Sequence, residues 1–483
     1  MSLSYSEVKE LASGKIGRLL FRYSWPALVA MTLNALYAVI DRAFIGHGCG
    51  VDAMAGIQLA MPAMMLLTAF GPLIGVGHAA VLSIKLGEGD RVTCEKLVGE
   101  TIALKILLYA VLIPLLYVFL DQVLSLCGAD KVTPGAAVAA KSYLQIVLFS
   151  HLFSHLAFGL SALHRAEGGA IRAMMCMVVG FGANVILDPI LIFGFGLGVV
   201  GAAWATDISM LLSCLWAFSY YLRGTSVVRL RLRRIWIYPS LVCRTFAIGL
   251  APFLQHFMSA VIIASLQVAF AKWMPDEASR TAEMASLGVF NSALILVIMP
   301  VLGCQQGLQP IFGYNWGARN FRRVLEALKK GLLVTTALTV FAFVIQVVPP
   351  FPTLIARMFV PSDSPDVIRL AASDLQLANC MIWTISINVV ATTFFQSIGK
   401  PAVAIVLSLL RQGVVLLPII WFLPRFLDDK AFAIWLSMPV SDVLCQLATI
   451  PPVLLHARFL SRIRPRKKFK KVSNPYPLDT NSF

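Results

Sequence analysis

The sequence predicts an all-α polytopic membrane protein with about twelve transmembrane helices in two six-helix lobes. Three observations lead to this fold class. Hydrophobic residues make up 58% of the 483 residues and charged residues only 13%, against roughly 25% charged in soluble domains. Apolar runs of membrane-spanning length recur along the chain, and its second half repeats features of the first. A soluble protein of this size cannot bury so much apolar surface, so most of it must face lipid.

Each apolar run has about 20 residues or more, the length that spans a bilayer as an α-helix. The runs predict helices over residues 19–40, 55–84, 101–120, 142–163, 173–193, 199–222, 245–271, 286–312, 331–350, 374–396, 401–423 and 431–456. Six of them fall in each half of the chain. With an even number per half, both halves enter the membrane from the same side. The pseudo-two-fold axis that relates the lobes therefore runs along the membrane normal.

The repeat is visible in individual residues. Ser24-Trp25-Pro26 opens one long apolar run, and Leu250-Ala251-Pro252 opens another 226 positions later. Further pairs with offsets of up to 231 positions are Gly77 and Gly307, Gly168 and Gly399, Pro189 and Pro418, and Trp204 and Trp435. Internal duplication in so apolar a chain is the usual plan of a secondary transporter, whose halves move against each other around a central site. Transport is therefore the leading functional hypothesis.

The basic residues carry an orientation signal. The formal net charge of +16 invites a nucleic-acid-binding interpretation, but the distribution of the charges argues against it. With both termini assigned to the cytoplasm and Arg22 counted with the N-terminus, 29 Lys and Arg residues fall on that side and 9 on the other, which is the positive-inside bias of membrane proteins. The sequence thus predicts a cytoplasmic N-terminus (1–18), a first lobe (19–222), a basic cytoplasmic linker (223–244), a second lobe (245–456) and a basic cytoplasmic tail (457–483).

Acidic residues inside apolar runs are the main functional candidates, because an Asp at the centre of a membrane helix costs about 2.5–3.5 kcal/mol on insertion scales. Asp41 ends the first run four residues after Tyr37, on the same helix face. Asp188 follows Asn184 with the same spacing on the fifth run. Pro189 comes next and deprives a carbonyl one turn earlier of its usual donor. These oxygen ligands suit either H⁺ or Na⁺, and they predict a cation-coupling site.

The sixth run extends this cluster, and alternatives stay open. Thr206 is a further member of the cation-coupling set, and Asp207 is a candidate for a substrate cavity. For Asp41, the competing interpretation is an interfacial acid paired with Arg42. For Asp207, and for Asp442 on the twelfth run, a structural pair with another helix explains the residue as well as function does.

Other polar residues in the runs are weaker candidates. Packing competes with the lining of a substrate cavity for five residues of the second half: Gln255, His256, Gln305, Gln306 and Gln309. Arg411 is expected to snorkel to the interface or to pair with an acid. The nine cysteines are scattered singly and predict neither a disulfide frame nor a metal site. Residues 196–201 fit G-x-G-x-x-G but lie in a hairpin between two membrane runs, so no nucleotide cofactor is expected.

The chain resembles the multidrug and toxic compound extrusion (MATE) family over about residues 15–455, and looks closest to its bacterial drug-efflux members. The segments that carry the resemblance are Tyr37 to Gly46 (YAVIDRAFIG), Gly71 to Asp90, Arg165 to Gly168 (RAEG), Asn184 to Pro189 (NVILDP), Gly198 to Thr206 (GVVGAAWAT) and Gly307 to Asn320 (GLQPIFGYNWGARN). Each is weak alone, but together they are specific.

The resemblance implies a monomeric inner-membrane antiporter of the kind that confers antibiotic resistance. Such a protein exports cationic or amphipathic compounds by rocking between inward-open and outward-open states, driven by H⁺ or Na⁺. In several members a first-lobe cation network matches Tyr37, Asp41, Asn184, Asp188 and Thr206. In others, acids on the seventh and tenth helices bind the cation. Here the seventh run has glutamines, and the tenth has only one acid, at its entrance.

Two rival functions are less well supported. A lipid-linked oligosaccharide flippase of the same superfamily would need several cationic residues in its cavity, yet apart from Arg22 at the start of the first run only Lys105 and Arg411 lie within the runs. An intramembrane enzyme is not expected either, because the chain has no H-E-x-x-H motif, no Ser/Lys pairing that would suit catalysis and no defensible Asp dyad. Neither the natural substrate nor the choice between H⁺ and Na⁺ follows from these residues.

Overall fold

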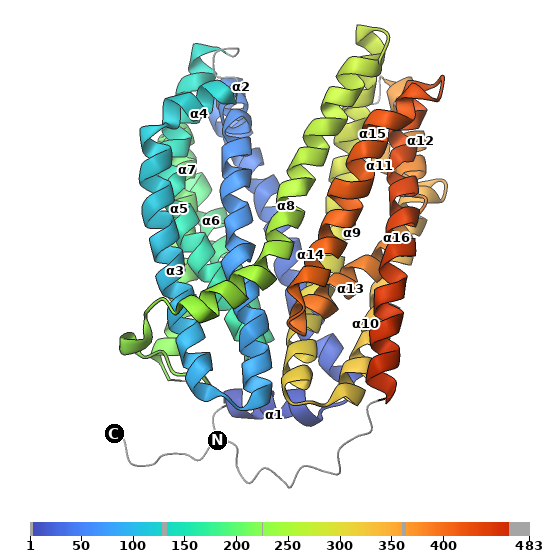
Figure 1. Cartoon of the computed structure of the whole chain (residues 1–483). Coiled ribbons are helices and arrows are strands. Elements are labelled where there is room, and N and C mark those ends of the chain that lie inside the picture. Colours follow the sequence, from blue (N-terminus) through green and yellow to red (C-terminus); the bar gives the residue numbers. More distant parts are fainter. Residues whose placement is uncertain (1–2, 128–132, 225, 360–363, 463–483) are drawn as a thin grey trace.

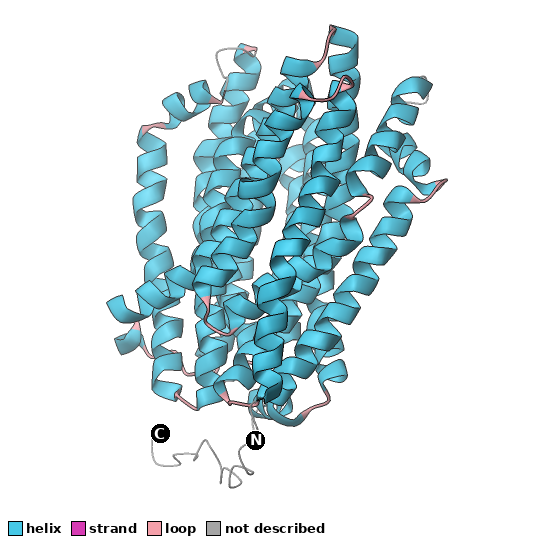
Figure 2. Ribbon diagram, turned by 45° about the vertical axis from the view of Figure 1, so that its right-hand side comes forward, coloured by secondary structure: helices cyan, strands magenta, loops and turns pink. Residues whose placement is uncertain are grey.

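The computed structural model describes residues 3–127, 133–224, 226–359 and 364–462. Within these residues every regular element is helical (Figure 2). The first half contains α1 (Leu3–Ser13), α2 (Ile16–Glu88), α3 (Arg91–Val118), α4 (Leu120–Leu126), α5 (Pro134–Ala166), α6 (Ala170–Pro189), η2 (Ile190–Gly194), α7 (Gly198–Leu222) and η3 (Leu232–Arg234). The second half contains α8 (Pro239–Trp273), α9 (Glu277–Gly317), α10 (Phe321–Val347), α11 (Phe351–Phe359), α12 (Pro365–Asn379), η4 (Ile382–Thr384), α13 (Ile385–Ser397), α14 (Pro401–Leu409), η5 (Leu410–Leu416), α15 (Leu417–Phe422), η6 (Leu423–Arg425) and α16 (Lys430–Arg462).

Eleven helical segments of the described chain are long and apolar enough to cross a membrane. α2 contains the first of them and also the predicted run 19–40. It cannot be a straight rod, because Gly307 of α9 lies against Ser24, and Gly317, ten residues further on, lies against Ile84. Ten helical residues span about 15 Å, whereas the sixty that separate Ser24 from Ile84 would span about 90 Å. α2 therefore folds back on itself (Figure 1), and each of the twelve predicted runs lies mostly in helical segments.

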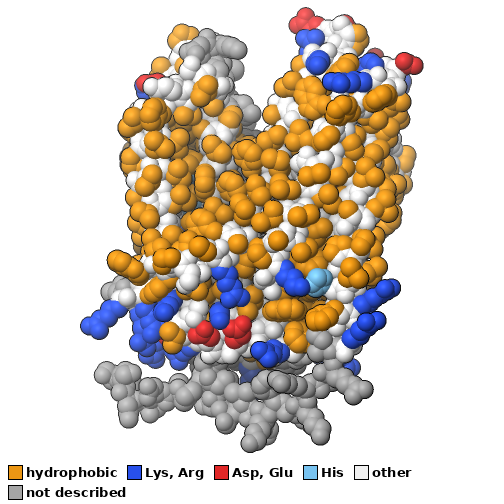
Figure 3. Space-filling model, in the orientation of Figure 1, with side chains coloured by type: hydrophobic (Ala, Val, Ile, Leu, Met, Phe, Trp, Pro, Cys, Tyr) orange, Lys and Arg blue, Asp and Glu red, His pale blue; other side chains and the backbone are white. Residues whose placement is uncertain are grey.

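The helices form two lobes that meet at the end where α1 lies and separate toward the other end (Figure 1). α8 connects them, since Ile248 near its start packs in a first-lobe core, whereas Phe270 near its end contacts Trp435 in the second lobe, with ring centroids 5.3 Å apart. Figure 3 shows a hollow between the two arms at the open end. The fold is thus the predicted two-lobed, all-helical membrane protein, in the shape of a V.

Charge and apolar surface are segregated along this V. On the face shown in Figure 3, a broad band of hydrophobic side chains covers the middle of both lobes. Lys and Arg side chains gather mostly at the end where α1 lies, and α16 also ends there (Figure 1). Such a band is what lipid-facing helices require, because lipid tails solvate apolar side chains and leave charged ones without partners.

The duplication also appears in the backbone. Left-handed residues end equivalent helices in the two halves: Gly89 (φ 80°) and Arg319 (φ 54°) follow α2 and α9, and Gly168 (φ 102°) and Gly399 (φ 74°) follow α5 and α13. Asp90 then caps α3, accepting a hydrogen bond of 3.1 Å from the backbone N–H of Thr93. The chain therefore breaks between α2 and α3 at residues 89–90, and both halves use the same local geometry.

Candidate functional site

An acidic cluster lies inside the first lobe, where α2, α6 and α7 pack together. The helices place six of the predicted residues there: Tyr37, Asp41, Asn184, Asp188, Thr206 and Asp207. Asn184 and Asp188 are fully buried, and Asp41, Thr206 and Asp207 are nearly so. Buried carboxylates in a membrane lobe are costly unless they bind or exchange a cation or proton.

The α6 part of the cluster is one helical turn. Asn184 Nδ2 donates a hydrogen bond of 3.1 Å to Asp188 Oδ1. Asp188 Oδ2 and Asn184 Oδ1 are buried and find no hydrogen-bond partner among the described residues. After Pro189, which cannot donate a backbone hydrogen bond, the chain continues as the π-helical segment η2. One helical turn of α6 therefore holds two buried acceptor oxygens without a described donor, and oxygens of this kind are the ligands of a proton or a hard cation.

The other two helices complete the cluster. The hydroxyl groups of Tyr37 on α2 and Thr206 on α7 lie 3.3 Å apart. The carboxyl groups of Asp41, Asp188 and Asp207 all lie within electrostatic reach of the Tyr37 hydroxyl. The Arg42 side chain, offered above as a partner for Asp41, lies outside the described side chains. The structure therefore unites all five predicted cation-coupling residues and adds Asp207 to them.

One further member was missed from the sequence. Tyr143 on α5 is buried and lies within electrostatic reach of Tyr37, Asp41, Asp188 and Asp207. Its only sequence signal is a polar hydroxyl in the fourth apolar run, and a tyrosine there equally fits ordinary packing. Beside the cluster lies a hollow of about 30 Å³, large enough for roughly one water molecule. It is lined by Leu33, Asn34, Tyr37, Cys176, Met177, Gly180, Phe181, Met210 and Ser213.

The second-half candidates for a substrate cavity lie on two helices, α8 and α9. Gln309 Nε2 donates 3.1 Å to the carbonyl of Val76 on α2. Gln306 Nε2 lies 3.7 Å from the sulfur of Met31, also on α2. Gln305 is half-buried beside them on α9. On α8, Gln255 is half-buried and His256 is exposed. Gln306 and Gln309 therefore lie where α9 meets α2.

A second pair of buried acids lies in the second lobe. Glu283 on α9 accepts a hydrogen bond of 2.9 Å from Trp435 Nε1, and Asp374 on α12 accepts one of 2.6 Å from the Ser286 hydroxyl. The two carboxyl groups are close enough to interact electrostatically. Glu283 precedes the eighth predicted run, so its place beside Asp374 does not follow from the residues of the seventh and tenth runs. The second lobe therefore also holds buried acids.

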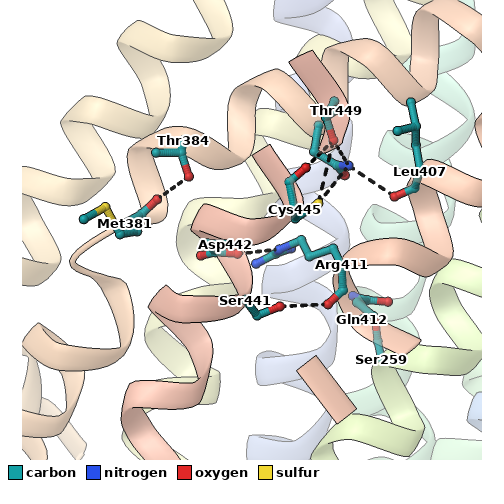
Figure 4. Close-up of polar contacts among 11 residues, drawn as sticks. Ser259, Met381, Thr384, Leu407, Arg411, Gln412, Ser441, Asp442, Cys445 and Thr449 are labelled. Carbon is teal, nitrogen blue, oxygen red and sulfur yellow. Dashed lines mark hydrogen bonds and ion pairs between the residues drawn. The ribbon is translucent and has the colours of Figure 1, made fainter. Parts of the chain in front are cut away.

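Arg411 pairs with an acid, which is one of the two arrangements predicted for its side chain. Its Nε donates a hydrogen bond of 2.8 Å to Asp442 Oδ1 on α16 (Figure 4). Asp442 is therefore half of an ion pair between helices, and the second lobe carries this pair instead of an isolated charge. Among the described residues, no group of three or more His, Cys, Asp or Glu side chains is arranged to hold a metal ion.

Comparison with known proteins places this geometry in a family. The family model described as MatE matches residues 26–190 and 255–422, one segment in each half of the chain. The multidrug export protein MepA of Staphylococcus aureus (strain MSSA476) is 26% identical over 436 residues, which cover 90% of this chain and 93% of MepA. MepA of Staphylococcus haemolyticus (strain JCSC1435) is 26% identical over 430 residues, covering 89% and 91% of the two chains.

Solved structures agree at the level of the fold. An outward-facing multidrug resistance MATE family transporter of the MOP superfamily superimposes with a TM-score of 0.85 at 20% sequence identity, covering 94% of this chain and 98% of that one. A MOP superfamily transporter from Pyrococcus furiosus gives a TM-score of 0.83 at 21% identity, with the same coverage. The two-lobed arrangement of twelve membrane helices is therefore shared.

Proposed function

The chain belongs to the MatE family, and on this premise we propose that it is an antiporter that exports cationic or amphipathic drugs in exchange for H⁺ or Na⁺. The observation that carries the coupling step is the first-lobe cluster. There, Asp188 and Asn184 each present a buried oxygen that has no donor among the described residues, and Asp41 lies within electrostatic reach of Asp188. A coupling ion that binds there supplies the missing positive charge.

Coupling follows from competition between two occupants of the same lobe. Protonation of Asp188, or Na⁺ bound between Asp41 and Asp188, neutralises the cluster and changes how α2 packs on α6. A cationic substrate needs the same acids in their ionised form, so ion and substrate alternate. The ion drives transport only if it binds the two access states with different affinities. The hydrogen bond between Tyr37 and Thr206 carries the change to α7.

Orientation follows from the charge distribution. The basic end, where α1 lies, is assigned to the cytoplasm by the positive-inside bias, which puts both termini there and the open end of the V outside (Figure 3). The two lobes, residues 19–222 and 245–456, then rock about the linker 223–244 in the bacterial inner membrane. A monomer suffices for this mechanism, and it needs neither a cofactor nor enzymatic chemistry.

Gradient-driven efflux tests the proposal. Purified protein in liposomes exports a fluorescent organic cation under an imposed pH gradient or an imposed Na⁺ gradient, applied separately. We expect Asp41→Asn and Asp188→Asn each to abolish export while leaving the melting temperature within a few degrees of wild type. Glu88→Gln, at an exposed residue of α2, serves as the matched control and retains export. Unchanged export in both Asp variants would overturn the assignment.

The flippase alternative requires a binding site of the opposite charge. A pyrophosphate-linked cargo requires unpaired cationic side chains, whereas the first-lobe cluster is acidic and Arg411 is bonded to Asp442. Lipid-linked oligosaccharide is therefore expected to compete with neither the fluorescent cation nor the coupling ion in the same liposomes.

A further inference from the structure

The Arg411–Asp442 pair is an ion pair deep inside the second lobe that the coupling mechanism does not use. Arg411 lies in η5, the π-helical segment between α14 and α15, and Asp442 lies on α16 (Figure 4). An intramembrane arginine is costly and marks a functional site by default. Counting back by the offset between Pro189 and Pro418, its counterpart in the first lobe is Gly182, where a Cβ would meet open space.

Two irregular helices lie beside this pair. The tenth predicted helix is broken, because η4, a single 3₁₀ turn at Ile382–Thr384, separates α12 from α13. Figure 4 shows Met381 and Thr384 on the side of Asp442 away from Arg411. The eleventh helix is distorted into η5. Discontinuous membrane helices typically form the binding sites of secondary transporters, and π segments are frequent at functional sites.

The pair is joined at a single point. Arg411 bonds to Asp442 through Nε, and its side chain remains 25% exposed. A guanidinium presents a rigid fork of N–H donors that can hold a carboxylate through two parallel hydrogen bonds. A single contact therefore leaves N–H groups of Arg411 that do not bond to Asp442. The backbone around it is anchored, because Ser441 donates to the Arg411 carbonyl at 3.0 Å and Gln412 donates to Ser259 on α8 at 3.0 Å.

Unsatisfied polar atoms adjoin both charges. Gln446 lies one helical turn after Asp442 on α16, on the same helix face. It is buried, and neither its Oε1 nor its Nε2 has a hydrogen-bond partner in the described part of the chain. The Oε1 atom of Gln412, next to Arg411, is in the same condition. Buried amide atoms left unpaired call for a ligand or ordered water.

We propose that Arg411 and Asp442 form a second-lobe binding site for zwitterionic amphiphiles that carry both a cationic nitrogen group and a carboxylate. The inference deepens the proposed export function by naming a substrate class. A purely cationic ligand bound to Asp442 leaves Arg411 without its partner, and an anionic ligand bound to Arg411 leaves Asp442 without its partner. Either case is unfavourable, because an unpaired buried charge is strongly destabilising. A zwitterion replaces both partners at once: its carboxylate pairs with the guanidinium of Arg411, and its cationic group pairs with the carboxylate of Asp442. Charge selectivity thus follows from the pairing itself.

Binding of two dyes that share a fluorophore tests this site. Rhodamine B is a zwitterion with a free carboxylate, and its ethyl ester is a cation of nearly the same shape. Fluorescence anisotropy on the purified full-length protein gives both affinities. In the double variant Arg411→Met/Asp442→Leu, which replaces the pair with apolar residues of similar length, we expect rhodamine B to bind at least about tenfold more weakly. The ester should bind within about twofold of wild type.

Each other outcome decides against the site. Unchanged rhodamine B affinity in the double variant, or an equal loss for both dyes, overturns the proposal, since the pair would then be irrelevant or purely structural. If the double variant does not fold, Arg411→Lys keeps the charge and removes the fork, and rhodamine B alone must weaken. Asp41→Asn separates the two proposals, because it abolishes ester export without altering rhodamine B binding at Arg411. Active ester export in Asp41→Asn contradicts the coupling mechanism only.

Discussion

Gly249 on α8 lies directly against Leu73 on α2: a Cβ atom on Gly249 would lie 1.8 Å from the Leu73 carbonyl oxygen. The contact is reciprocal, because a Cβ on Gly77, one turn along α2, would lie 2.1 Å from the carbonyl oxygen of Thr245. Small residues spaced by four let two membrane helices approach closely. α8, the helix that links the lobes, therefore packs on the first lobe through direct contact between the two helix backbones.

This contact predicts that Gly249→Ala is destabilising. A methyl group cannot occupy the space, so α8 must move away from α2, at a cost of about 1–3 kcal/mol. The melting temperature of the purified protein in detergent should fall. Gly288→Ala is the matched control, since Gly288 lies within the helix α9 and a Cβ there meets nothing within 4 Å. An equal melting temperature for wild type and Gly249→Ala would show that the close approach is absent in the membrane protein.

A second prediction concerns the hydroxyl of Tyr37. Tyr37→Phe removes its hydrogen bond with Thr206 and nothing else, a change worth about 0.5–1.5 kcal/mol. The protein should fold, but gradient-driven export of the organic cation should fall severalfold, because the link from the acidic cluster to α7 is lost. Tyr117→Phe, at an exposed position on α3, controls for the substitution. Wild-type export by Tyr37→Phe would exclude the hydroxyl from coupling.

Much of this arrangement could be predicted from spacing alone. Tyr37 with Asp41, and Asn184 with Asp188, share a helix face by virtue of a four-residue interval, and the structure brings both pairs to one cluster. The repeated glycines mark close helix contacts in both halves, since Gly77 lies against Thr245 and its repeat partner Gly307 lies against Ser24. Helical periodicity and duplication are local or linear properties, so a single chain reveals them.

What could not be predicted depends on contacts between helices. Tyr143 joins the acidic cluster, and Glu283 approaches Asp374, only because of how the helices pack. Several acids lie in the same lobe as Arg411, and the packing of α16 against η5 places Asp442 within hydrogen-bond distance of it. Sequence spacing constrains one helix at a time, and the rotation of one helix against another stays free.

A third prediction is a pH dependence of stability that arises from Glu167, which lies between the spans α5 and α6. Burial raises the pKa of this carboxyl from 4.5 to about 7, although hydrogen bonds from Ser226, Tyr221 and Tyr220 oppose the rise. An acid with a raised pKa binds its proton more tightly in the folded protein. Its stabilising contribution is therefore complete below about pH 4.5 and is lost as the pH rises through about 7.

The matched variant for this prediction is Glu167→Gln, which keeps an acceptor oxygen and cannot ionise. Between about pH 5 and about pH 8, the melting temperature of wild type should fall more steeply than that of Glu167→Gln. Differential scanning fluorimetry across this range measures both slopes. Parallel curves for the two proteins would mean that Glu167 does not titrate in the folded state within that range.

The last prediction concerns the basic linker. Glu95, buried on α3, receives Arg231 Nε at 3.1 Å and Arg234 Nη1 at 2.5 Å, and its removal leaves these linker arginines without their acid. Charge-assisted hydrogen bonds of this kind contribute about 1.5–3 kcal/mol, so in Glu95→Gln the linker should open at least about tenfold more often. Limited trypsin digestion should then cleave after the linker arginines correspondingly faster. Glu326→Gln breaks an exposed pair with Lys330 on α10 and should leave that rate unchanged, so equal cleavage in the two variants would refute the role of Glu95 as the anchor of the linker.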